Sequence, residues 1–364
     1  MIRPRILAAT LFAALATPAS AQDSVTQTHI SQFGAWLDNA SAVLTIDSST
    51  DTEVFAPILE AFAKRVPDLA IRYREITTNE LNDLAERGCS GAEPAADLVV
   101  SSSIDQQVKL ANDGCAQPNH SAQVKALPAW AKWRDEVVGL TYEPAVIVYN
   151  RDLVPPAQVP RSRFDLIDLL RPEENPFTGR IATYDIEASG VGYLFAFMDA
   201  QQATTFGRLI EAFGRNKVVA TCCSAEIIDA VASGRFLIGY NMLGSYALAR
   251  AAQDRRIGVV APTDYTLVLA RAALIPKRAQ NPELARRFID FALSDAGRQL
   301  LADSGLIVSF GEAGGGPSSL TGAVPTLRPI ALSPALLIGL DKQTRENFLA
   351  LWRSSLGSAG AGVR

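Results

Sequence analysis

The stretch Val43–Phe62, VLTIDSSTDTEVFAPILEAF, decides the fold class. It begins as a short apolar strand, continues through the hydroxyl residues Ser48, Ser49 and Thr50, and then places apolar residues at helical spacing. A strand that runs through a short polar junction into a helix is the repeating unit of α/β domains. The sequence therefore predicts an α/β fold, provided that the unit recurs.

The same alternation continues along most of the chain. Because strands separated by helices favour parallel pairing, we expect two mixed, mostly parallel sheets. The 364 residues also exceed what one hydrophobic core usually serves, which favours two domains. Strand-like stretches are found at 42–46, 70–75, 97–100, 140–149, 180–184, 217–220, 236–240, 257–261 and 267–275.

Two of the apolar strands are longer than the rest and are candidates for connections between lobes. They span 139–150 and 265–276, and they predict hinge crossings near 142–150 and 262–272. Lobe one would then comprise 41–145 plus 270–364, and lobe two 150–265. The helix near the end of the chain, with Phe348 and Trp352 on one side, is expected to pack on lobe one.

The N-terminal residues 1–21 have the pattern of a secretory signal peptide. Arg3 and Arg5 precede an apolar stretch too short to span a bilayer, and a small-residue cleavage pattern ends at Ala21. We therefore expect a soluble protein of the periplasm. In that oxidising compartment Cys89 and Cys115, which flank a strand and a helix, are a possible disulfide. For the neighbours 222 and 223, both cysteines, two reduced thiols are the plainer expectation, and a disulfide stays open.

Charge and motif content exclude several classes of function. Removal of Arg3 and Arg5 from the 34 basic side chains leaves 32 against 38 acidic ones, a formal charge of −6, which argues against nucleic acid as a partner. The only histidines, His29 and His120, lie in polar stretches, so a catalytic triad or zinc site is poorly supplied. No nucleophile elbow or phosphate-binding loop occurs. We expect no enzyme, no catalytic residues, no metal ligands and no cofactor.

Hydroxyl-rich junctions follow five of the predicted strands. In an open α/β sheet these junctions lie at the carboxyl ends of the strands, where ligands bind and where helix N-termini favour anions. Ser, Thr, Asp and Asn are also the preferred helix N-caps, so each junction has a purely structural explanation. Asp51 and Glu53 beside the first junction would repel a phosphate. The junctions contain Ser49 and Thr50, Ser102 and Ser103, Ser189 and Gly190, Thr221 and Ser224, and Asn241.

The order of several segments resembles the extracellular solute-binding proteins of ABC transporters. Within these, the chain is similar to the type II periplasmic group usually labelled ferric-iron-binding, which also includes binders of hexose phosphates and phosphoglycerate sensors. The resemblance covers roughly 41 to 310. The segments are SSTDTEVFAPILEAF (48–62), SSSIDQQVKLANDG (101–114), EPAVIVYNRDLVP (143–155), SGVGYLF (189–195), DAVASGRFLIGYNMLGSYA (229–247) and IPKRAQNPELARRFIDFALSDAGRQLLADSG (275–305).

The resemblance implies two lobes that are joined by a two-strand hinge and close on a small ligand. It implies a membrane permease as partner, or in some relatives a sensor kinase, and we expect a monomer. Asp185 or Glu226 would accept hydrogen bonds from ligand hydroxyl groups. Carried over by position, the ligand-binding residues are Ser49, Thr50, Ser102, Ser103, Ser189, Gly190, Thr221, Ser224, Tyr240 and Asn241.

One departure from the iron-binding relatives bears on the ligand. Those relatives hold the metal with two adjacent tyrosines, whereas the eight tyrosines here are isolated, and Tyr184 and Tyr193 are nine positions apart. Phenolates are hard donors of the kind that Fe³⁺ prefers. The sequence therefore predicts a small anionic solute, foremost a phosphorylated metabolite, with ferric iron or a ferric chelate and other small solutes as the alternatives.

Overall fold

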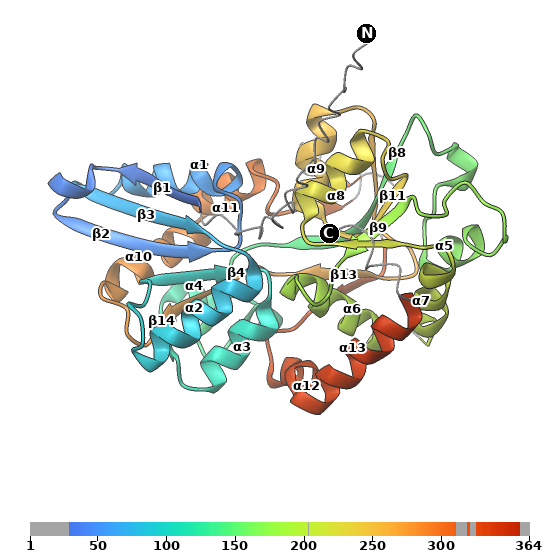
Figure 1. Ribbon diagram of the computed structural model, residues 1–364. Coiled ribbons are helices and arrows are strands. Elements are labelled where there is room, and N and C mark those ends of the chain that lie inside the picture. Colours follow the sequence, from blue (N-terminus) through green and yellow to red (C-terminus); the bar gives the residue numbers. More distant parts are fainter. Residues whose placement is uncertain (1–28, 203, 311–318, 321–324, 357–364) are drawn as a thin grey trace, which may run out of the picture.

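The computed structural model describes residues 29–202, 204–310, 319–320 and 325–356, and it has two β-sheets covered by helices (Figure 1). The predicted signal peptide, residues 1–21, lies outside the described residues. The mixed α/β architecture with two sheets confirms the predicted fold class. The sheets are not mostly parallel as expected, because most strand pairs of the first sheet are antiparallel and the second sheet has as many antiparallel as parallel pairs. We name the part around the eight-stranded sheet the first lobe and the part around the seven-stranded sheet the second lobe.

The first lobe is built on a sheet of eight strands in the order β1-β3-β2-β4-β14-β7-β6, with β5 paired to β14. β2 pairs in parallel with β3 and β4, whereas β14 runs antiparallel to β4 and β7. The strands are β1 (His29–Gly34), β2 (Ala42–Ser48), β3 (Leu69–Glu75), β4 (Leu98–Ser101), β5 (Ala116–Gln117), β6 (Lys132–Trp133), β7 (Val137–Gly139) and β14 (Ala272–Pro276). Its helices are α1 (Thr52–Ala63), α2 (Thr78–Ser90), α3 (Ile104–Asn112), α4 (Ala122–Ala126), α10 (Pro282–Leu293) and α11 (Asp295–Asp303).

The second lobe is built on seven strands in the order β10-β9-β11-β8-β13-β17, with β12 paired to β8. β9 pairs in parallel with β10 and β11, and β8 is antiparallel to its neighbours. The strands are β8 (Glu143–Asn150), β9 (Ile181–Tyr184), β10 (Val219–Thr221), β11 (Ile238–Leu243), β12 (Ile257–Val260), β13 (Thr266–Leu269) and β17 (Leu327–Pro329). The helices are α5 (Arg163–Leu169), α6 (Gly190–Gln202), α7 (Phe206–Arg215), α8 (Ser224–Ala232) and α9 (Gly244–Gln253).

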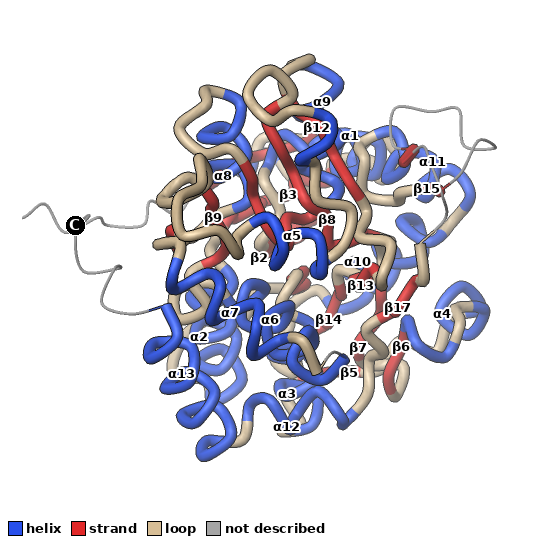
Figure 2. The backbone as a smooth tube through the Cα atoms, turned by 90° about the vertical axis from the view of Figure 1, so that its right-hand side faces the viewer, coloured by secondary structure: helices blue, strands red, loops and turns tan. Residues whose placement is uncertain are grey.

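The remaining elements are short or follow the two sheets. β15 (Ser309–Phe310) pairs in parallel with β16 (Ser319–Leu320). The 3-10 turns are Leu37–Asn39, Ala129–Ala131, Pro156–Gln158 and Pro334–Leu336, and the last leads into α12 (Leu337–Leu340) and α13 (Lys342–Leu356). The tube view places α12 and α13 together at one side of the molecule, beside α3 and α7 (Figure 2).

Two of the crossings of the chain between the sheets lie at adjacent positions. β7 ends in the first sheet at Gly139 and β8 begins in the second at Glu143, and β13 and β14 are separated only by Ala270 and Arg271. The crossings are hydrogen-bonded to each other, because the Leu140 amide donates to the Arg271 carbonyl at 2.8 Å. Two short, paired connections of this kind form a candidate hinge.

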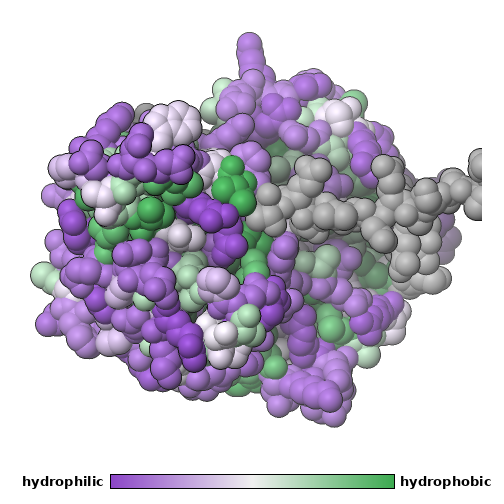
Figure 3. All heavy atoms as spheres, turned by 60° about the vertical axis from the view of Figure 1, so that its left-hand side comes forward, coloured by the Kyte–Doolittle hydropathy of each residue, from purple (hydrophilic) through white to green (hydrophobic). Residues whose placement is uncertain are grey.

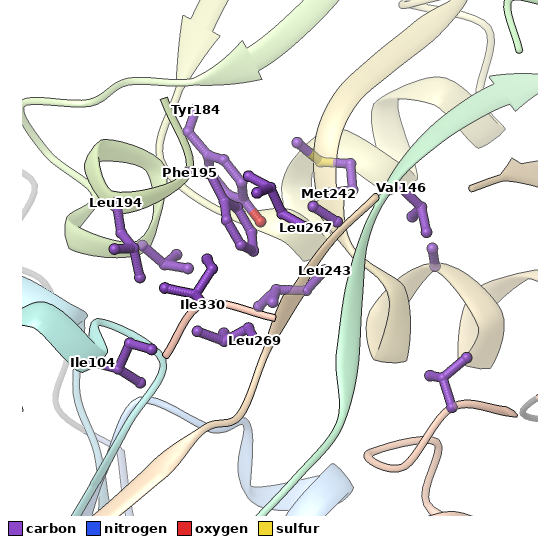
Figure 4. Close-up of a cluster of buried hydrophobic side chains, with 14 of the residues drawn as sticks. Ile104, Val146, Tyr184, Leu194, Phe195, Met242, Leu243, Leu267, Leu269 and Ile330 are labelled. Carbon is purple, nitrogen blue, oxygen red and sulfur yellow. The ribbon is translucent and has the colours of Figure 1, made fainter. Parts of the chain in front are cut away.

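Apolar side chains form cores inside each lobe and also a buried cluster that includes residues of both. Phe55, Phe62 and Phe288 pack edge to face in the first lobe. Ile104 of α3 belongs to the same cluster as Leu194 of α6, and the close-up shows how these side chains approach (Figure 4). Hydrophilic residues cover most of the face drawn in the space-filling view, with hydrophobic ones in smaller areas (Figure 3).

The end of the chain packs differently from the expectation. Phe348 and Trp352 of α13 join a cluster with Tyr193, Phe197 and Phe206 of the second lobe, not the first. The sequence shows that one side of this helix is apolar, but either lobe could have covered that side. The apolar faces of α6 and α7 do so here, and β17 likewise joins the second sheet beside β13.

Two disulfides occur in the described residues. Cys89 at the end of α2 is joined to Cys115, with an S–S distance of 2.01 Å and a Cα–Cα distance of 5.3 Å. The neighbours Cys222 and Cys223 are also joined, where two reduced thiols were the plainer expectation. None of the helices described here has the length and the apolar run needed to cross a membrane.

Candidate functional site

A cavity of about 470 Å³ lies between the two lobes, and both contribute to its wall. Its wall is formed by strand-to-helix junctions, which lie at the edge where ligands bind in open α/β sheets. These junctions follow β2, β3, β4, β9, β10 and β11. The first lobe lines it with Ser49, Asp51, Glu75, Ile76, Thr77, Thr78, Glu80 and Ser102. The second lobe lines it with Tyr184, Ala188, Ser189, Val191, Cys222, Cys223, Ser224, Ala225, Glu226, Leu243 and Tyr246.

Four of the predicted ligand-binding residues line this cavity. Ser49 and Ser102 come from neighbouring junctions of the first lobe, and Ser189 and Ser224 begin helices of the second. β2 and β4 are adjacent parallel strands, so the junctions that follow them meet at one edge of the sheet. Their contact is direct, since the Ser49 hydroxyl accepts a hydrogen bond from the Ser102 amide at 3.0 Å.

Several hydroxyl groups of the junctions bind the backbone of their own loops. The Ser48 hydroxyl accepts from the Thr50 amide and the Ser101 hydroxyl from the Ser103 amide, each at 3.0 Å. The Ser189 hydroxyl accepts from the Gly192 amide at 3.1 Å, in the manner of a helix cap. The hydroxyl groups of Ser48, Ser101 and Ser189 therefore stabilise their own loops or helix ends, as the structural explanation for the junctions expects.

Three more predicted residues are buried next to the cavity without lining it. The Thr50 hydroxyl accepts a hydrogen bond from Arg271 at 2.8 Å, and the Ser103 hydroxyl donates to Asp105 at 2.8 Å. The Gly190 amide donates to the Thr78 hydroxyl at 2.8 Å, and a Cβ atom at 190 would lie 2.6 Å from the Ser103 hydroxyl oxygen. Gly190 thus permits a close approach between α6 and the first lobe.

The remaining four predicted residues do not line the cavity. The Asp185 carboxylate accepts from the Glu187 amide at 2.9 Å and shapes its own turn, while the Thr221 hydroxyl donates to Glu226 at 2.9 Å. Tyr240 and Asn241 donate to the buried Asp199 carboxylate at 2.7 and 2.8 Å.

The partners of Asp199 explain why Tyr240 and Asn241 are withdrawn from the cavity. Asp199 also accepts hydrogen bonds from Arg163 and Tyr265, each at 2.8 Å. A carboxylate and a guanidinium that are both buried need their hydrogen bonds satisfied, which fixes the neighbouring donors in the interior. Asn241 itself has a φ of 62°, in the left-handed region that Asn tolerates better than most residues.

Sequence reasoning singled out Asp51 and Glu226 but missed the other two carboxylates on the cavity wall, Glu75 and Glu80. Glu75 accepts hydrogen bonds from the amide and the hydroxyl of Thr52, both at 2.8 Å, and therefore occupies the N-terminus of α1. Asp51, Glu80 and Glu226 complete a set of four acidic side chains. A usable signal existed, because Glu75 is the last residue of the predicted strand 70–75, the end at which ligand-binding residues are expected.

Burial raises the pKa of the Asp51 carboxyl, and the negative charges of Glu75 and Glu53 raise it further. The Tyr246 hydroxyl, which donates to Asp51 at 2.8 Å, acts in the opposite direction. Within the described chain, no Lys, Arg or His side chain belongs to the cavity wall. The buried Arg271, which donates to the Ser49 carbonyl at 3.3 Å, also lowers the pKa of Asp51, but its charge is paired with Glu143 at 3.1 Å.

The lobes touch each other beside the cavity. Tyr246 of α9 reaches Asp51, accepting from its amide at 3.2 Å as well as donating to its carboxylate. Elsewhere the Asn79 side chain donates to the carbonyls of Glu187 and Ala188, both at 3.0 Å. The cavity is thus bounded by direct contacts between residues distant in the sequence.

Comparison with known proteins places these features in a family. The family model described as bacterial extracellular solute-binding protein matches residues 44–307. Comparison with curated proteins finds no match. The solved structure of the substrate binding protein of the ABC transporter from Agrobacterium tumefaciens is 36% identical, with a TM-score of 0.83, and the match covers 91% of this chain and 99% of that one.

More distant solved structures share the fold. Iron-bound HitA from Pseudomonas aeruginosa is 17% identical with a TM-score of 0.63, covering 86% of this chain and 99% of that one. The periplasmic binding protein AfuA from Actinobacillus pleuropneumoniae, with fructose-6-phosphate bound, is 17% identical with a TM-score of 0.66, covering 87% and 99%. The extent of the family match and the identity to the Agrobacterium protein are decisive: the chain belongs to the bacterial extracellular solute-binding proteins.

Proposed function

We propose that this protein is the periplasmic solute receptor of an ABC importer. The observation that carries the proposal is the cavity of about 470 Å³, whose wall is built from both lobes beside the paired crossings. The similarity to the substrate binding protein of an ABC transporter from Agrobacterium tumefaciens supports the same assignment. The proposed role is binding and delivery, not turnover, and the match to the extracellular solute-binding family supports it.

The proposed mechanism is lobe movement about the two crossings. A solute that contacts one lobe recruits groups of the other, and the closed form is the one that the permease recognises. Ser49 and Ser102 are contributed from one side, and Ser189 and Ser224 from the other. Because the crossings at 140–142 and 270–271 are short, rotation there changes the cavity without disturbing either sheet.

The wall bears on which solute is bound. The sequence predicted an anionic, phosphorylated metabolite, but such a ligand would meet four carboxylates, and the α1 N-terminus is already occupied by Glu75. The wall is also poorly suited to ferric iron. No group of three or more His, Cys, Asp or Glu side chains suited to a metal is found in the described residues, and burial raises the pKa of both wall phenols, that of Tyr184 to about 12. The wall therefore favours neither an anion nor iron.

The permease assignment is tested by photo-crosslinking in intact cells. A photoreactive amino acid is placed at Glu53 of α1 or at Ala225 of α8, exposed residues of the two lobes that line one groove. We expect both positions to capture the permease subunit of an ABC transporter, and a position at the exposed Arg298 of α11 to serve as control. Specific capture of a histidine kinase from the same two positions would overturn the importer and favour a sensor.

A further inference from the structure

We propose that the solute is an organic ammonium compound, a small molecule with a protonated amine that is held by carboxylates of both lobes. The inference rests on the proposed function, since it concerns the same cavity. The cavity itself is established by its wall of nineteen residues from both lobes, and the carboxylates decide only which charge it accepts.

The balance of charge on the wall is negative. Asp51, Glu75, Glu80 and Glu226 contribute four carboxylates, and no basic side chain of the described residues lines the cavity. Six helices, α1, α2, α3, α6, α8 and α9, begin at or beside the wall. Each N-terminus contributes about half an elementary charge, about +3 in total, which does not offset the four carboxylates. A cation restores neutrality, whereas a phosphate dianion would increase the imbalance.

The protein itself fills one place where an anion would bind. Helix N-termini attract phosphate because their first N–H groups have no partner in the helix. At α1, Glu75 accepts from both the amide and the hydroxyl of Thr52 at 2.8 Å. A phosphate would have to displace this carboxylate, whereas an ammonium group would bind to its outer face without breaking either hydrogen bond.

The carboxylates lie on both sides of the cavity. Asp51, Glu75 and Glu80 belong to the first lobe and Glu226 belongs to the second. Closure of the lobes brings like charges together, which is unfavourable in a partly desolvated site. A cation between them removes this repulsion and adds attraction to both sides, so its binding is coupled to closure.

The rest of the wall suits an organic molecule better than a bare metal ion. Tyr184, Val191 and Leu243 add apolar atoms to the wall, and Tyr246 adds an aromatic ring of the kind that attracts cations. A volume of about 470 Å³ is in the range of small-molecule pockets and far exceeds a single ion. Serine hydroxyl groups supply further polar contacts for the remainder of the solute.

The test compares charges on matched solutes. Purified ligand-free protein is screened by thermal shift at millimolar concentrations against putrescine, spermidine, choline and glucosamine, and against inorganic phosphate, glucose 6-phosphate and 3-phosphoglycerate, with glucose as the neutral partner of glucosamine. We expect at least one amine to raise the melting temperature and the anions to leave it unchanged. Calorimetry then measures the dissociation constant of the best amine.

Charge variants show whether the wall carboxylates hold that amine. Asp51→Asn keeps the size and the helix-capping ability of the residue, and we expect affinity to fall at least about tenfold. Glu226→Gln, at an exposed position, should weaken binding by a smaller factor. Glu60→Gln makes the same charge change on the exposed side of α1, away from the cavity, and should leave affinity unchanged.

The outcomes separate this inference from the proposed function. Binding of an anion in preference to every amine, or tighter anion binding by Asp51→Asn together with unchanged amine affinity, overturns the ammonium assignment and leaves the solute receptor intact. If no amine binds, the ammonium assignment is overturned, whereas the solute receptor is judged separately by the crosslinking to the permease. An amine that binds equally well to the wild type and to Asp51→Asn and Glu226→Gln also refutes the role of the carboxylates.

Discussion

Replacement of Arg271 by Met tests the buried ion pair at the hinge. Arg271 and Glu143 are both fully buried, with 0% of either side chain exposed. Arg271 donates to the two Glu143 oxygens at 3.1 and 3.2 Å, to the Thr50 hydroxyl at 2.8 Å and to the Ser49 carbonyl at 3.3 Å. The guanidinium therefore joins the second crossing to the start of the second lobe and to the first junction of the cavity wall.

The expected loss follows from what Glu143 retains. After Arg271→Met its carboxylate keeps only the hydroxyl donors Thr141 and Ser245, which do not compensate its charge. Removal of one partner of a buried ion pair costs about 3–5 kcal/mol of unfolding free energy, because the other charge stays buried and unpaired. Combining Arg271→Met with Glu143→Leu removes both charges, so most of that loss should be recovered.

Urea unfolding of the ligand-free protein, followed by circular dichroism, measures these differences. Lys109→Met is the matched control, because Lys109 pairs with Asp113 one helical turn away and both side chains are more than a third exposed. Such surface pairs contribute about 0.3–0.5 kcal/mol. A loss below about 1 kcal/mol for Arg271→Met, or a double variant no more stable than the single one, would refute the reasoning.

Two further predictions concern α6 and α3. Gly190→Ala places a methyl group 2.6 Å from the Ser103 hydroxyl oxygen and should lower the unfolding free energy, measured with denaturant, by about 1–3 kcal/mol. Gly207→Ala is the control, because no atom lies within 4 Å of the added group, and it should be neutral or slightly stabilising. Equal effects of the two variants would contradict the close contact at Gly190. Burial raises the pKa of Asp105 to about 6, so the folded protein binds this proton more tightly than the unfolded chain does, and stability falls as pH rises from about 4 to about 6. Asp105→Asn should remove this dependence of stability on pH, and it should stabilise the protein by up to about 3 kcal/mol at pH 7 but not at pH 3.5. Thermal unfolding measured across this pH range tests the prediction. A pH profile of stability that is the same in the variant and the wild type would contradict the role given to Asp105.

The sequence was sufficient for the elements whose signals are local. The alternation of apolar strands, polar junctions and amphipathic helices is a short-range pattern, and it predicted the α/β class and placed Ser49 and Ser102 at one edge of a sheet. β1 was missed because His29–Gly34 shows no apolar alternation, and it is held by backbone pairing with β3. Backbone pairing of this kind leaves little trace in the side chains.

The site was harder to predict because its contacts are long-range. Tyr240 and Asn241 follow a strand, as a wall residue should, but Asp199 lies 41 and 42 positions away and binds them in the interior. Glu75 lies on the cavity wall because β3 pairs with β2, and the sequence does not show which strands pair. The full set of wall carboxylates, on which the proposed class of solute rests, therefore became visible only in the folded arrangement.

The C-terminal segment adds a third link between the lobes. α12 packs against α3 of the first lobe and continues directly into α13, which is bound to α7 of the second. A rotation that moved α3 away from α6 would have to detach this segment, whereas the lobes are joined between α1 and α9 by the hydrogen bonds of Tyr246 with Asp51. We therefore expect the lobes to open on one side of the cavity. The side held by α12 and α13 would stay closed and contain the axis of rotation, and the solute would enter on the side of Asp51 and Tyr246.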